Sequence, residues 1–180
     1  MSLLQRFLGI ETTGSSRGGA GETTSVRRIA ETLEQMAPDQ ARYIAAFAYI
    51  LARVAQADLT IDAQEVAAMR EILRGLGRLS EEEAAVVCEI ACDQSTRLGG
   101  SQNYLVTREF RAITDTKQRA QLVECLFAVA AADGEISTTE SQEVVTIAEE
   151  LGFTRPEALG IRARYQEHLA EFRGLTNESA

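Results

Sequence analysis

The sequence is short of positive charge. It has 18 Lys and Arg residues against 27 Asp and Glu residues, which gives a net charge of −9. Nucleic-acid-binding proteins gather Lys and Arg to displace phosphate counterions, so this shortage argues against a nucleic-acid partner. Long apolar runs are also missing, because Arg53 and Gln56 interrupt the longest run before it reaches the ~18 residues of a membrane span. We therefore expect a chain that is not transmembrane and whose negative field suits cations or basic partners.

Groups that carry out catalysis are scarce as well. His168 is the only histidine, and its polar neighbours predict a solvated side chain. The three cysteines, Cys88, Cys92 and Cys125, show no CxxC spacing and lie in apolar segments, as buried thiols in a reducing cytosol do. No Gly-rich segment is followed by the Lys-Ser/Thr of a phosphate-binding loop. We expect no enzyme and no catalytic residue, and a cytoplasmic location because the N-terminus also lacks the pattern of a signal peptide.

Composition divides the chain into three parts. Residues 1–24 combine a short apolar segment with the Gly/Ser/Thr-rich stretch from Gly14 to Thr24, which predicts a flexible tether. Residues 25–173 form the expected globular domain, long enough for a sizeable core. Residues 174–180 are polar and are expected to be a flexible tail.

The globular part predicts an all-α fold. Ala, Glu, Leu and Arg dominate it, and the alternating β-branched pattern of strands is absent. Short connections between the expected helices imply a compact antiparallel bundle of about seven to eight helices. Counted from their capping residues where these are evident, the expected helices span about 26–36, 39–57, 62–77, 81–93, 102–113, 115–132, 137–151 and 154–171.

One segment of this helical part occurs twice, at an offset of 75 positions. Each copy, about 42–77 and 117–152, reads as a helix, a short connection and a second helix, so a helical hairpin is duplicated around a shared core. The second copy has Gly134 where the first has Leu59, so the two turns must differ. The matching pairs are Leu51/Leu126, Val54/Val129, Asp58/Asp133, Ile61/Ile136, Glu65/Glu140, Ile72/Ile147, Leu76/Leu151 and Gly77/Gly152.

The repeated acids, Asp58, Glu65, Asp133 and Glu140, continue the apolar stripes of their helices when positions three or four apart are followed. We therefore expect all four carboxylates at the inner edge of the hairpins. Carboxylates in such a place need hydrogen bonds, a cationic partner or a metal ion, because an uncompensated buried charge costs several kcal/mol.

Two interpretations of these acids stay open. In the first, they only cap helices: Ser137 with Glu140 forms a Ser-x-x-Glu capping box, and Asp62 with Glu65 is its near equivalent. In the second, they bind a divalent cation, because the stretch from Asp133 to Glu140 reproduces the second half of an EF-hand loop.

A complete EF-hand is excluded, since Val129 and Ala131 stand where its first acidic ligands belong. The two hairpins would instead pool their acids in one site. The predicted ligands are Asp58, Glu65, Asp133 and Glu140, with Asp62 and Glu135 as auxiliary ligands. Hard oxygen ligands favour Ca²⁺, Mg²⁺ or Mn²⁺.

The pattern L..L..VA.ADG.I...E...I..I...LG in residues 122–152 resembles the TerB-like family, named after tellurite resistance protein B. The same domain resembles the N-terminal part of the membrane-anchored DnaJ-like co-chaperone DjlA, and the resemblance extends over about Arg42 to Tyr165. It implies an all-helical, internally duplicated domain whose signature acids, here Asp133 and Glu140, are proposed to bind metal. It also implies a stress or tellurite response, protein partners in a membrane-associated complex, and a place at the inner face of the membrane. A metal-free scaffold or co-chaperone-like interaction domain is the alternative function.

Overall fold

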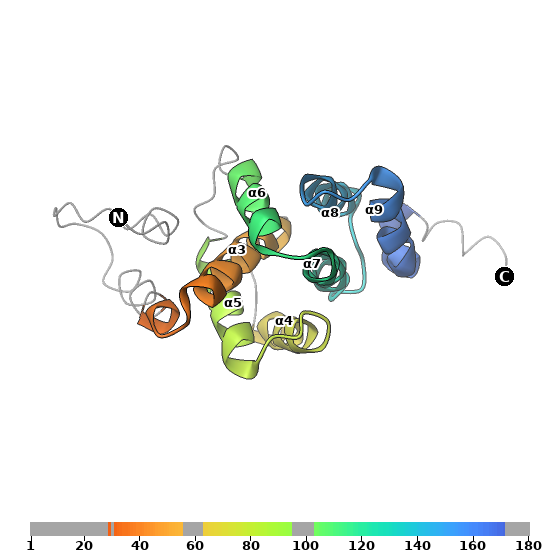
Figure 1. Cartoon of the computed structure of the whole chain (residues 1–180). Coiled ribbons are helices and arrows are strands. Elements are labelled where there is room, and N and C mark those ends of the chain that lie inside the picture. Colours follow the sequence, from red (N-terminus) through yellow and green to blue (C-terminus); the bar gives the residue numbers. More distant parts are fainter. Residues whose placement is uncertain (1–28, 30, 56–62, 95–102, 172–180) are drawn as a thin grey trace, which may run out of the picture.

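The computed structural model describes residues 29, 31–55, 63–94 and 103–171 (Figure 1). The N-terminal segment, the tether, the loop expected near Gly99 and the polar tail lie outside these residues. A short helical segment that includes residues 31–34 comes first. The later helices are α3 (Pro38–Ala55), α4 (Ala63–Gly75), α5 (Glu81–Gln94), α6 (Asn103–Ile113), α7 (Thr116–Ala130), α8 (Thr138–Glu150), α9 (Arg155–Arg162) and the 3₁₀ helix η2 (Ala163–His168).

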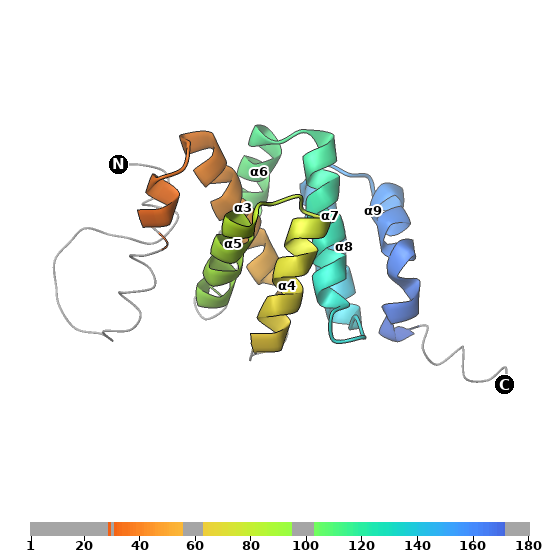
Figure 2. The ribbon, with the colours of Figure 1, turned by 90° about the horizontal axis from the view of Figure 1, so that it is seen from below.

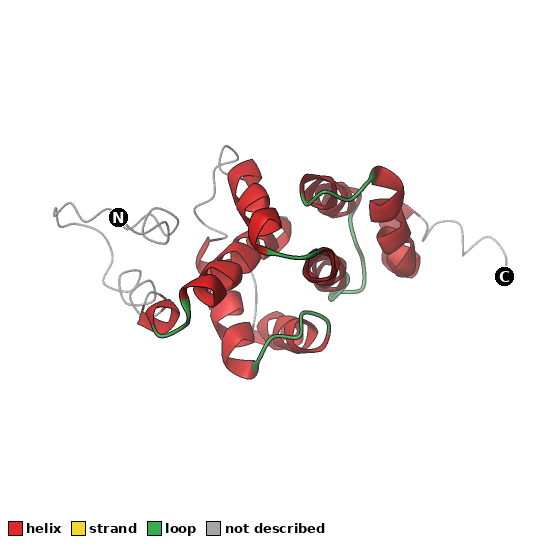
Figure 3. Ribbon diagram, in the orientation of Figure 1, coloured by secondary structure: helices red, strands yellow, loops and turns green. Residues whose placement is uncertain are grey.

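The all-α prediction is confirmed. The described ranges contain helices and connections but no strand (Figure 3). Their only β-type pairing is an isolated parallel bridge between Ile136 and Leu169. No helix in the same ranges is long and apolar enough to cross a membrane.

Side chains at the predicted caps begin several of these helices. Asp115 at the start of α7 and Ser137 at the start of α8 each accept a hydrogen bond from the backbone N–H three residues later. The residue at that third position bonds back to the capping residue's own N–H, which completes a capping box in both cases. The same exchange joins Ser80 and Glu83 before α5. These caps satisfy amide groups that a helix start leaves without a partner.

Helix α3 is the centre of the bundle. It packs against α5, α6, α7 and α8, while α4 packs against α5 and α7 (Figure 1). Ile44, Phe47 and Leu51 on α3 are fully buried. Phe47, Phe110 of α6 and the half-buried Tyr43 form a cluster of aromatic rings with centroids 5.3 to 6.2 Å apart. Burying side chains of this size is the main source of stability for such a bundle.

The predicted hairpin repeat is visible in the helix bounds. α4 and α8 start and end at positions 75 residues apart, and α3 and α7 end at the equivalent residues Ala55 and Ala130. α3 packs on α7, and each of them also packs on the second helix of the other copy, α3 on α8 and α7 on α4. The two copies therefore share one core.

The prediction of one helix from 154 to 171 is wrong. α9 ends at Arg162, η2 follows, and Tyr165 has non-helical dihedral angles inside η2. The Tyr165 ring stacks on Phe127 of α7 with centroids 5.5 Å apart, and its hydroxyl donates to the Glu124 carbonyl at 3.1 Å. Beyond η2, Leu169 is buried and extended beside Ile136. Packing against α7 thus overrides the local helical preference at the end of the domain.

Candidate functional site

The turn between α7 and α8 carries the acids of the second copy. Gly134 in this turn has φ of +96°, a conformation that glycine adopts without the steric cost of a side chain. Asp133 Oδ1 accepts a hydrogen bond from the Glu135 N–H at 3.0 Å. The Asp133 side chain therefore stabilises this turn locally.

Ser137 and Glu140 form the predicted capping box. The Ser137 N–H donates to Glu140 Oε2 at 2.8 Å, and the Glu140 N–H donates to Ser137 Oγ at 3.2 Å. The Glu140 carboxylate is half-buried and lies in the first turn of α8, where the helix dipole favours negative charge. The capping interpretation of this acid is confirmed.

The expected inward orientation of Asp133 is wrong. Its side chain is exposed, as is that of Glu135. The reason is that α7 ends at Ala130, with Ala131 as its C-cap, so Asp133 lies past the helix. The apolar stripe of α7 therefore does not extend to Asp133.

The acids of the first copy are only partly within the structure. Asp58 and Asp62 lie outside the described residues, and Glu65 belongs to the first turn of α4 by its backbone alone. Among the side chains that the structure does describe, no three His, Cys, Asp or Glu residues form a group that could hold a metal ion. A shared site for all four repeated acids thus stays a prediction.

The backbone brings the end of α3, the start of α4 and the α7–α8 turn to one end of the bundle. α3 ends and α4 begins at the end where α7 passes into α8, the lower end in Figure 2. The packing of α3 on α7 and of α4 on α7 agrees with this view. The exposed Asp133 and Glu135 carboxylates lie at that end, where they can reach a hydrated cation without a large desolvation cost.

Two of the three cysteines that the sequence assigned to the core are there. Cys88 and Cys125 are buried and Cys92 is half-buried, all as free thiols. Burial raises the pKa of both the Cys88 and the Cys125 thiol to about 12. Thiols with such pKa values are protonated at neutral pH and are poor nucleophiles.

His168 is half-buried, whereas the sequence predicted a solvated side chain. It lies at the end of η2, where its backbone carbonyl accepts a hydrogen bond from the Ile136 N–H at 2.7 Å. The pairing of Ile136 with the C-terminal segment therefore accounts for the position of this residue.

An ion network inside the bundle was missed by sequence reasoning. Arg53 of α3 has a side chain only 5% exposed, and it donates to Glu143 at 2.7 and 3.0 Å and to Glu150 at 2.8 Å. Thr107 of α6 also donates to Glu150, at 2.8 Å. Burial alone lowers the pKa of the Arg53 guanidinium, but the bonds and charges of the two glutamates outweigh burial and raise it. The only signal in the sequence was an arginine inside an otherwise apolar helix face.

These features define a class of protein: an all-helical domain built from a duplicated hairpin, with an acidic turn at one end of its bundle. The family model of tellurite resistance protein TerB matches residues 44–163, and the chain belongs to this family. That range nearly coincides with the stretch that carries the sequence resemblance. No curated protein and no solved structure matches the chain significantly.

Proposed function

We propose that this TerB-family domain is a non-catalytic module that binds a divalent cation at the end of the bundle where its two hairpin connections lie. The observation that carries the proposal is that α3 ends and α4 begins at the end of the bundle where the α7–α8 turn holds Asp133 (Figure 2). The family name suggests a response to tellurite or a related stress. In that setting the module would contact a protein partner of a membrane-associated complex from the cytoplasmic side.

The ligands would be hard carboxylate oxygens from both copies. Asp133 and Glu140 each use one oxygen in local hydrogen bonds, Oδ1 and Oε2, which leaves Asp133 Oδ2 and Glu140 Oε1 for a cation. Helix capping and cation binding are therefore compatible in the second copy. Asp58, Asp62 and Glu65 would supply the first copy's oxygens, with Glu135 as a further ligand. Such a set suits Ca²⁺, Mg²⁺ or Mn²⁺.

The alternative is a metal-free scaffold or co-chaperone-like interaction domain. The capping box of Ser137 and Glu140 favours it, because these hydrogen bonds satisfy the helix start without any ion. In that case the turns serve only to shape the bundle, and binding to a partner is the whole function.

Thermal unfolding with and without cation separates the two proposals. The full chain is melted in a chelator and then in excess Ca²⁺, Mg²⁺ or Mn²⁺. At about 100 times the dissociation constant, a cation adds ~2.7 kcal/mol to the free energy of unfolding. For a chain of this length, that corresponds to a rise in Tm of about 5 to 10 °C.

The decisive variant is Asp133→Asn with Glu140→Gln, because Asn and Gln keep the hydrogen bonds and remove the charges. We expect it to lose the cation-dependent rise while its Tm in chelator changes little. The matched control is Asp115→Asn with Glu157→Gln, which changes two capping acids at the opposite end of the bundle. It should keep the rise. No rise with any of the three cations, or an equal rise in both variants, would support the metal-free alternative.

A further inference from the structure

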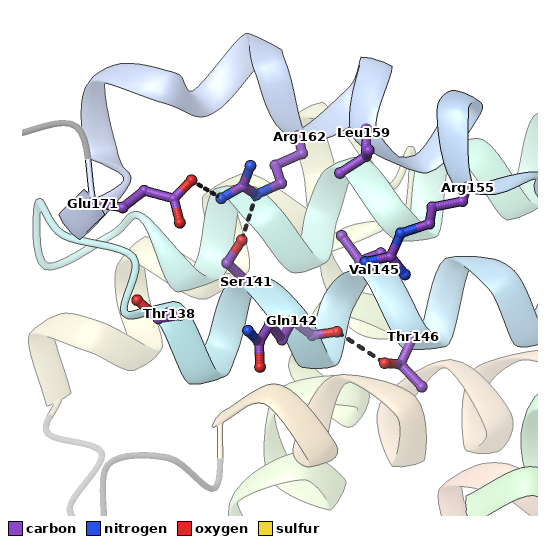
Figure 4. Close-up of a pocket in the computed structure, with 9 residues that line it drawn as sticks. All are labelled: Thr138, Ser141, Gln142, Val145, Thr146, Arg155, Leu159, Arg162 and Glu171. Atoms are coloured by element: carbon purple, nitrogen blue, oxygen red, sulfur yellow. Dashed lines mark hydrogen bonds and ion pairs between the residues drawn. The ribbon is translucent and has the colours of Figure 1, made fainter.

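A groove of about 390 Å³ lies between α8 and α9 (Figure 4). Arg155, Leu159 and Arg162 point into it from α9, and Ser141 and Val145 form part of the opposite wall on α8. The groove is separate from the acidic turn of the candidate cation site, although α8 begins at that turn. Two arginines line it, although the net charge of the chain is −9.

Arg155 and Arg162 are separated by seven residues, or about two helical turns and ~10 Å along the axis. Leu159 lies between them on the same face and is 40% exposed. Arg155 is 66% exposed, and its ion pair with Glu149 is long at 3.4 Å. Exposed pairs of this kind contribute little stability, so Arg155 can exchange its partner easily. The face therefore presents an exposed cation and then an apolar side chain, followed by Arg162, whose side chain is 18% exposed.

Arg162 already holds a carboxylate. Its Nε donates to Ser141 Oγ at 2.6 Å, and its Nη2 forms an ion pair with Glu171, which follows η2. Ser141 is buried, so the guanidinium is oriented from within the fold. A guanidinium positioned in this way binds carboxylates with strong, directional hydrogen bonds. Glu171 thus shows which chemistry this end of the groove accepts.

We propose that the α8–α9 groove binds an acidic amphipathic helix of a partner protein. The partner presents Asp or Glu residues two turns apart, one for Arg155 and one for Arg162, with an apolar side chain between them for Leu159 and Val145. This is recognition of a helix by a groove, in which residues one and two turns apart anchor the contact. The partner's carboxylate displaces Glu171 from Arg162. The proposal names the surface used for protein contact and does not depend on the cation site.

The probe is a synthetic helical peptide of about 15 residues with Glu at two positions seven apart and Leu between them. It is titrated into the ¹⁵N-labelled full chain while amide chemical shifts are followed. The shifts should change in residues 138–146 and 155–171, because these segments carry the residues that line the groove. A peptide with Gln in place of both Glu residues should bind about tenfold more weakly.

Two arginine variants whose wild-type side chains are equally exposed make the test more specific. Arg155 and Arg164 are each 66% exposed and lie on the same segment, but Arg164 pairs with Glu124 of α7 outside the groove. Arg155→Gln should weaken binding about tenfold, whereas Arg164→Gln should leave it unchanged. Glu171→Gln should tighten binding, because it removes the internal competitor for Arg162.

Three results would overturn the proposal: no shift changes at millimolar peptide, equal effects of Arg155→Gln and Arg164→Gln, or equal binding of the Gln peptide. If acetate or inorganic phosphate alone reproduced the full pattern of shifts at similar concentration, the groove would be a site for small anions and the helical partner would be wrong. None of these outcomes changes the expected result of thermal unfolding with and without cation. The groove proposal and the cation-site proposal can therefore be contradicted independently.

Discussion

The two copies of the hairpin place their second helices at equivalent positions in the chain but in different surroundings. α8, in the second copy, is enclosed by α3, α6, α7 and α9, whereas α4, in the first, packs mainly on α5 and α7. Leu151 after α8 is fully buried, while its equivalent Leu76 is 38% exposed. The repeated pattern therefore sets where a helix begins and ends, and the neighbouring helices set how much of it is buried.

The exits of the two second helices differ as well. In the second copy the chain leaves α8 through Gly152, which has φ of +95°. In the first copy the positive φ, +54°, falls on Arg78, one residue after the equivalent Gly77. Gly77 is required for another reason, since a Cβ there would lie 2.5 Å from the Leu73 carbonyl oxygen. The glycines at this repeated position, Gly77 and Gly152, thus have different physical roles.

The largest expected effect comes from removing the ion pairs that join the two hairpin copies. Arg53 of the first copy forms ion pairs with Glu143 and Glu150 of the second copy. The residue equivalent to Arg53 in the second copy is Ala128, which cannot form the reciprocal ion pairs. Arg53→Met should lower the free energy of unfolding by ~3 to 5 kcal/mol, because it leaves two partly buried carboxylates without their cation. Urea unfolding measures the loss.

Arg74→Met is the control for that experiment. Arg74 forms ion pairs of 3.1 and 3.0 Å with Glu71 and Glu81, but it is 44% exposed. Its loss should cost less than about 1 kcal/mol. Similar losses in the two variants would mean that the buried network does not hold α8 against α3.

The next effect compares equivalent leucines. Leu151→Ala should cost ~2 to 5 kcal/mol, because it opens a cavity in the shared core. Leu76→Ala should cost clearly less, about 1 kcal/mol, since that residue is already 38% exposed. Equal losses in urea unfolding would contradict the difference in burial between the two copies.

The repeated glycines should respond differently to asparagine. Ala at either position is expected to cost about 1 to 2 kcal/mol, by backbone strain and crowding of the Arg111 side chain at Gly152 and by collision with a backbone carbonyl at Gly77. Asn tolerates positive φ better than Ala, so Gly152→Asn should recover part of the loss. Gly77→Asn should recover none. Recovery at both positions, or at neither, would show that the two exits are alike.

The smallest expected loss in the free energy of unfolding comes from removing the N-cap of a helix. Ser137→Ala should cost about 1 kcal/mol, because it removes the N-cap of α8. If the first copy is capped in the same way, Asp62→Ala should cost a similar amount. A loss at Ser137 alone would show that the turn of the first copy is built differently and would weaken the symmetry on which the shared cation site depends.

Much of the fold could be predicted because its signals are local. Capping residues such as Asp115 and Ser137 and the apolar periodicity between them define helix limits over a few residues. The same local chemistry predicted the capping role of Glu140. The repeat pointed to a shared core because each copy alone has an unsatisfied apolar face.

The rest depends on contacts between distant segments. The end of α9 is decided by Tyr165 stacking on Phe127, and the place of Arg53 by glutamates on a helix that lies 90 residues or more away in sequence. Asp133 was placed on the wrong side because the apolar stripe of α7 was continued past Ala130, where the helix ends. The groove between α8 and α9 could not be predicted from the sequence for the same reason. It forms only when the two helices pack together, which places Arg155 and Arg162 along one groove.

The most direct test of the central claim is paramagnetic broadening by Mn²⁺ in the ¹⁵N-labelled full chain. A cation held between the two connections should broaden the amide signals near Asp58, Asp62 and Glu65 together with those near Asp133, Glu135 and Glu140, at the same substoichiometric concentration of Mn²⁺. The broadening should disappear in Asp133→Asn with Glu140→Gln. Broadening of one copy alone, or signals that stay sharp in both, would contradict a shared site and leave the repeated acids as helix caps.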